Sequence, residues 1–174
     1  MNTESTNEKD QPRSGAMSNT LIKALIDNYR QNHLTAINDA LGIEDAHSIW
    51  FDLPKLKSFI ALIEKEASKI NPECTEEDLG IRFYYAAYPK VENWDIMENH
   101  PVPQEYSERH TLVMIPTLKK ESEEGEKLDY DFNSLTQQNL ALSACGVAPK
   151  DDDGDMGENQ GTLTPPGNPK TQKY

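Results

Sequence analysis

The residue pattern that most resembles a metal-binding motif is an acidic run near the C-terminus that surrounds one glycine. Asp151, Asp153 and Asp155 have the spacing with which a calcium-binding loop presents its first oxygen ligands. The rest of that loop is missing, because Met156 stands where glycine is needed and Thr162 where a bidentate glutamate is needed. We therefore interpret the run as a solvated acidic tail, with a calcium site as the alternative.

A second set of residues could support acid–base catalysis. Glu108 and His110 lie two residues apart, on the same side of a predicted strand near its start. They favour a small hydrolase or ligand-binding enzyme with its site in the loop 90–110. No glycine-rich phosphate loop follows any predicted strand. Cys74 and Cys145 form no metal or redox motif, so we expect no cofactor and no metal centre.

A third set consists of aromatic and basic side chains, the types that dominate binding hot spots. The stretch 79–89 alternates in a way that is typical of a strand, so Arg82, Tyr84 and Tyr88 are expected on one face. Ile81, Phe83, Tyr85 and Ala87 are expected on the opposite face, against the core. The candidate binding residues are Trp50, Arg82, Tyr84, Tyr88 and Trp94. The alternative is that the tyrosines only pack beneath a helix.

Two long helices are predicted to support these residues. One spans about 19–41, with a serine or asparagine cap before an apolar stripe and Gly42 after it. The other spans about 53–70, between the cap residue Asp52 and Asn71-Pro72.

Strands are predicted at 47–52, 79–89 and 110–117. The order strand, helix, strand over 47–89 indicates a βαβ unit with a parallel crossover. Residues 119–131 are interpreted as a charged loop, and a short helix at 133–144 could cover the face that bears Tyr84 and Tyr88.

Composition divides the chain into one domain and two tails. Residues 1–18 and 146–174 are polar and rich in glycine, proline or acids, so we predict that both are disordered. The intervening segment 19–145 has the size of a single domain. We predict an α/β (α+β) fold in which a small mixed sheet of about three strands is packed by the two long helices.

The charge limits the classes of partner. The formal net charge is −13, which disfavours direct binding to nucleic acid because a phosphate backbone requires clustered Lys and Arg. An acidic chain instead suits a basic protein partner. No apolar run is long enough for a membrane span, and the N-terminus lacks a signal-peptide pattern. We expect a cytoplasmic protein with no membrane contact.

The pattern Ile49-Trp50-Phe51, Gly80-Ile81-Arg82-Phe83-Tyr84-Tyr85, Tyr88-Pro89 and Thr111-Leu112-Val113-Met114-Ile115-Pro116-Thr117 resembles one in uncharacterised small bacterial α/β proteins. The resemblance covers roughly 20–120. It implies a shared fold and a bacterial origin, and it implies no activity.

The sequence thus favours a non-enzymatic protein-interaction module, for example an acidic immunity-type or regulatory protein. Its partner would be another protein, with a basic one favoured by the charge, and a homodimer is a further alternative. The rival hypothesis is the small hydrolase or ligand-binding enzyme described above.

Overall fold

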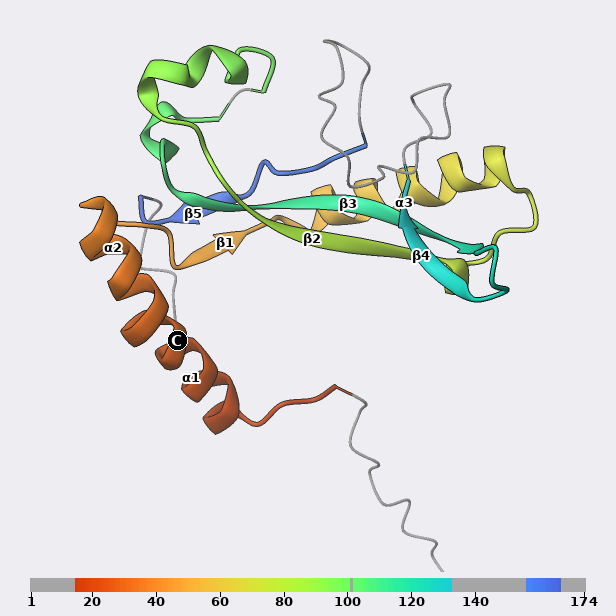
Figure 1. Cartoon of the computed structure of the whole chain (residues 1–174), viewed down its shortest axis with the longest axis horizontal. Coiled ribbons are helices and arrows are strands. Elements are labelled where there is room, and N and C mark those ends of the chain that lie inside the picture. The colour runs from red at the N-terminus through yellow and green to blue at the C-terminus, as the bar shows by residue number, and fades with distance from the viewer. Residues whose placement is uncertain (1–14, 101, 133–155, 167–174) are drawn as a thin grey trace, which may run out of the picture.

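The computed structural model describes residues 15–100, 102–132 and 156–166. It has a mixed α+β fold with a three-stranded and a two-stranded sheet (Figure 1), which confirms the predicted fold class. The strands are β1 (Ser48–Trp50), β2 (Leu79–Ala87), β3 (His110–Glu121), β4 (Lys127–Asp131) and β5 (Thr162–Thr164). The helices and helical turns are α1 (Asn19–Asn28), η1 (Tyr29–Leu34), α2 (Thr35–Leu41), α3 (Leu53–Ile70), η2 (Glu76–Asp78), η3 (Val91–Met97) and η4 (Gln104–Tyr106).

The N-terminal helix consists of α1, η1 and α2, which follow one another without a break and match the predicted helix 19–41. The Ser18 hydroxyl accepts a hydrogen bond from the Leu21 N–H at 3.2 Å, and Gly42 ends the helix with a φ of 68°. The predicted apolar stripe is not buried along α1, where Leu21 and Leu25 are exposed. Figure 1 shows α1 projecting away from both sheets.

The second helix, α3, has the predicted boundaries and supplies much of the core. The Asp52 carboxylate caps it by accepting from the Lys55 N–H at 2.8 Å. Phe59, Ile63 and Ala67 are buried on the side that faces the three-stranded sheet. Burial of each large apolar side chain contributes about 1.5–3 kcal/mol before the entropy of ordering is subtracted.

Strand pairing differs from the predicted βαβ crossover. β2 pairs with β3 and β3 with β4, all antiparallel, while β1 pairs antiparallel with β5 in the separate sheet. The predicted parallel partnership of the first two strands is therefore wrong. The reason is that β3 returns alongside the whole of β2, and β1 finds its partner near the C-terminus instead.

The segment 119–131 is also different from the predicted charged loop. β3 continues to Glu121, and β4 follows a tight turn in which the Ser122 N–H donates to the Glu126 oxygen at 2.8 Å. Gly125 has a φ of 81°, a conformation that glycine adopts without strain. Although β4 is rich in charged residues, it alternates as a strand does, with Leu128 and Tyr130 at every second position.

Part of the predicted C-terminal tail is ordered. Residues 156–166 include β5, and Met156 and Leu163 are buried. A Cβ at Gly161 would lie 2.4 Å from Ile49 Cγ2, so only glycine lets this segment pass beside β1. The predicted helix 133–144, the residues 1–14 of the N-terminal tail and the remainder of the C-terminal tail lie outside the described residues.

Candidate functional site

Among the residues that the structure describes, strand β2 has an open edge, because it stands at the end of the order β2-β3-β4. Phe83 lies opposite Met114, whose backbone exchanges hydrogen bonds with Glu158 on the far side of β3, at 2.9 and 3.1 Å. Phe83 and Met114 are therefore a non-hydrogen-bonded pair, and the backbone N–H and C=O of Phe83 point away from β3. By the same alternation the polar groups of Ile81 and Tyr85 point outward.

Within the part of the chain that the structure describes, the backbone groups of Ile81, Phe83 and Tyr85 form no hydrogen bond. We call this outward side of β2, with its unpaired N–H and C=O groups, the β2 edge. A row of such groups is a template for another extended chain.

Large apolar side chains accompany the β2 edge. Phe83 is 52% exposed and Tyr85 is 91% exposed. The prediction that these two face the core is wrong, although Ile81 does pack against it. The reason is that the buried side of α3 contacts Met114 and Leu118 of β3. No other element in the described ranges covers Phe83 and Tyr85, which stay exposed. Proteins commonly protect such an edge with lysine, proline or a bulge, and β2 contains none of the three.

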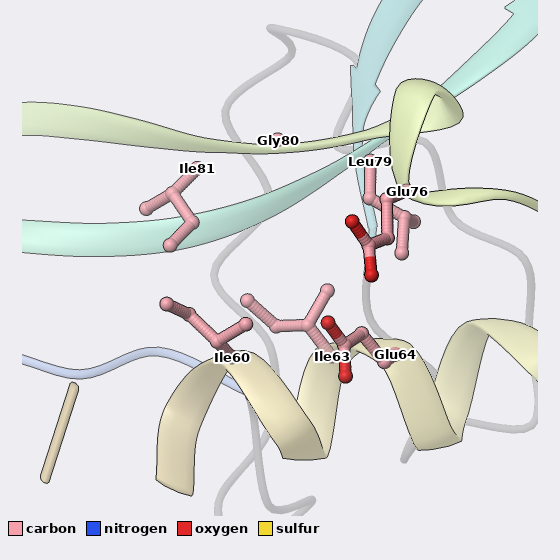
Figure 2. A pocket seen from close by; sticks show the side chains of 7 residues that line it. All are labelled: Ile60, Ile63, Glu64, Glu76, Leu79, Gly80 and Ile81. Carbon is pink, nitrogen blue, oxygen red and sulfur yellow. The ribbon is translucent and has the colours of Figure 1, made fainter. Parts of the chain in front are cut away.

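A groove lies beside the β2 edge, between α3 and the first residues of β2. It has a volume of about 340 Å³ and an apolar floor with two carboxylates at its mouth (Figure 2). We call it the α3–β2 groove. Its lining residues are Ile60, Ile63, Glu64, Glu76, Leu79, Gly80 and Ile81.

Two of the predicted binding residues meet on the opposite face of the sheet. The Arg82 guanidinium and the Tyr84 hydroxyl both donate to the carboxylate of Asp131 on β4, and Arg82 also donates to the Asp129 oxygen at 2.8 Å. The predicted alternation is thus confirmed for Arg82 and Tyr84. Their polar groups are engaged within the sheet, where they connect β2 with β4.

The other three predicted binding residues lie elsewhere. Tyr88 is buried with Trp94 and Tyr106, at ring separations of 6.2 and 5.9 Å, and burial raises the pKa of its hydroxyl. That hydroxyl donates to the Asn159 oxygen at 3.1 Å, so Tyr88 holds the C-terminal segment. Trp50 is exposed on β1. The five residues therefore do not form one surface.

The predicted acid–base pair is not assembled either. His110 Nδ1 pairs with the carboxylate of Asp45, whereas the Glu108 carboxylate lies 4.0 Å from Lys90 Nζ. Asp45 is fully buried and also accepts from the N–H groups of Ala46 and His110, each at 2.7 Å. Its main effect is to hold the segment after α2 against the start of β3. No sequence signal marked Asp45, because its partner is 65 residues away.

The remaining candidate features are the metal ligands, the thiol of Cys74 and the apolar helices. Among the described residues, no group of three or more His, Cys, Asp or Glu side chains could hold a metal ion. Asp151, Asp153 and Asp155 lie outside those residues. Cys74 is half-buried, and burial raises the pKa of its thiol, which disfavours the reactive thiolate. No helix in the described ranges combines the length and apolar character of a membrane span.

Comparison of the chain with protein-family models, with curated proteins and with solved structures finds no match.

Proposed function

We propose that this protein is a non-enzymatic interaction module of the cytoplasm that captures an extended segment of another protein by adding it as a strand to the β2 edge. The observation that carries the proposal is the outward row of backbone groups at Ile81, Phe83 and Tyr85. Strand addition supplies affinity through main-chain hydrogen bonds, and pockets for alternate side chains supply specificity.

The exposed aromatic side chains support this reading. Phe83 and Tyr85 present apolar surface beside the unpaired backbone groups. Tyr and Phe are enriched at protein interfaces, where their area is removed from water. A long apolar edge also promotes aggregation unless a partner covers it. The arrangement is therefore best explained by a binding role.

The charge favours a different protein over a second copy as the occupant. Two copies, each with a formal net charge of −13, repel each other, whereas a basic segment is attracted. The ion pair of Arg82 with Asp131 leaves no free cation on β2 to attract an acidic partner. We therefore take the partner to be an extended segment of another, basic protein.

Selection from a displayed library of random peptides about ten residues long, enough to span β2, tests the proposal. Two variants distinguish the contribution of the backbone N–H to binding from that of the side chain. Both lose the phenyl ring, but Phe83→Ala keeps the outward N–H and Phe83→Pro removes it. We expect enriched peptides to bind Phe83→Pro about threefold to tenfold more weakly than Phe83→Ala, the value of one hydrogen bond. Equal binding by both variants, or no enrichment, would contradict strand addition.

Light scattering distinguishes a foreign partner from a second copy. We expect the wild type to be monomeric. A dimer that Phe83→Pro dissociates would show that a second copy occupies the β2 edge, and the proposal of a foreign partner would then be wrong.

A further inference from the structure

We propose that the α3–β2 groove selects an arginine or lysine of the captured segment, holding its aliphatic stem over the isoleucines and its cation between Glu64 and Glu76. This inference rests on the proposed function, because it names the side chain that the added strand would place there.

The position of the groove follows from the register of β2. Leu79 and Ile81 point toward α3, and both line the groove. Directly paired residues of neighbouring strands direct their side chains to the same face of a sheet. A strand added at the β2 edge therefore directs the residue paired with Ile81 toward the same side, where the groove opens.

The floor of the groove suits an aliphatic stem. It is formed by Ile60 and Ile63 of α3 together with Leu79 and Ile81 of β2. Ile60 is 45% exposed, so part of this apolar floor is in contact with water. Long basic side chains cover such surface with their methylene groups while the charged end stays hydrated.

The mouth of the groove suits the cation. Glu64 reaches it from α3 and Glu76 from η2, and Figure 2 shows both carboxylates directed into the space between these elements. Within the described residues, neither carboxylate forms an ion pair or a hydrogen bond. Other acids of the fold do have one, as Asp131 does with Arg82. Two carboxylates that face one apolar floor without an ion pair favour a cation and repel an anion.

The peptides enriched by the library supply the first test. We expect Arg or Lys at one fixed position of an alternating pattern. Synthetic copies in which that residue is replaced by Gln should bind about threefold to tenfold more weakly, because they lose a contact between opposite charges, and copies with Glu should bind more weakly still.

Variants of the protein supply the second test. The double variant Glu64→Gln/Glu76→Gln should also bind the basic peptide about threefold to tenfold more weakly, since both residues are exposed, and its affinity should depend less on salt. The control Glu92→Gln/Glu98→Gln removes the same charge from the η3 region, which does not line the groove. It should retain the affinity of the wild type.

The outcomes separate this inference from the proposed function. Peptides that are sensitive to Phe83→Pro but carry no basic residue, or that bind Glu64→Gln/Glu76→Gln as tightly as the wild type, would overturn the groove assignment alone. A library that yields no binder would overturn both.

Discussion

Arg82 and Asp131 lie on strands that do not pair with each other, and their side chains form an ion pair across the central strand β3. The Tyr84 hydroxyl donates to the same carboxylate. Asp131 is largely buried, with 8% of its side chain exposed. The contact fixes β2 relative to β4, so the β2 edge exists before any partner binds.

Removal of that carboxylate should weaken the sheet. We expect Asp131→Ala to lower the free energy of unfolding by about 1–2 kcal/mol, because two side chains lose their acceptor and Arg82 remains partly hydrated. Urea denaturation measures the change. Asp129→Ala is the control, since the hydrogen bond from Arg82 goes to the backbone oxygen of Asp129 and is kept in this variant, which should stay within about 0.5 kcal/mol of the wild type. Equal losses would contradict the role of Asp131.

The hydroxyl of Tyr88 should stabilise the C-terminal segment. Tyr88→Phe removes the hydrogen bond to the Asn159 oxygen and should cost about 0.5–1.5 kcal/mol in thermal or urea unfolding. Tyr85→Phe removes the same atom from a side chain that is 91% exposed, and it should be close to neutral. If the two changes had the same effect, Tyr88 would not anchor this segment.

The packing of β5 against β1 should depend on Gly161. A Cβ there would meet Ile49 Cγ2 at 2.4 Å and Phe51 Cζ at 2.8 Å, so Gly161→Ala should cost about 1–3 kcal/mol. Gly157→Ala is a milder change, because its nearest neighbour is the flexible end of Ile115 at 3.3 Å. A Gly161→Ala variant as stable as the wild type would argue that 156–166 does not pack on β1.

Acid should destabilise the fold partly through His47. Burial lowers the pKa of His47, and the charge of Arg30 lowers it further. The unfolded chain therefore takes up this proton first, near the ordinary value of about 6.5, and stability falls as the pH drops below it. The loss of stability between about pH 7 and pH 5 should be smaller in His47→Gln. A His47→Gln variant that keeps the full wild-type dependence on pH would contradict this assignment.

Local signals predicted the helices well. Ser18, Asp52 and Gly42 act at the positions that capping chemistry assigns them. Hydrogen bonds within a few residues set these ends, so a single sequence contains the necessary information.

Partners distant in the chain were not predictable in the same way. β1 pairs with β5, more than a hundred residues later, in a segment where only Met156 and Leu163 are large buried apolar residues. Alternation assigned Arg82 and Tyr84 to one face correctly, but it could not show that Asp131 would engage them. It also could not show that α3 would leave Phe83 and Tyr85 uncovered, since coverage depends on where the helix lies.

Hydrogen exchange of individual amides in the free protein, followed by NMR, tests the central claim most directly. The outward N–H groups of Ile81, Phe83 and Tyr85 should exchange fast, while those of Arg82 and Tyr84, which face β3, should be protected. Adding a selected peptide should then protect the outward set. If the outward amides were already as protected as the inward ones in a monomer, the β2 edge would be occupied and the account would be wrong.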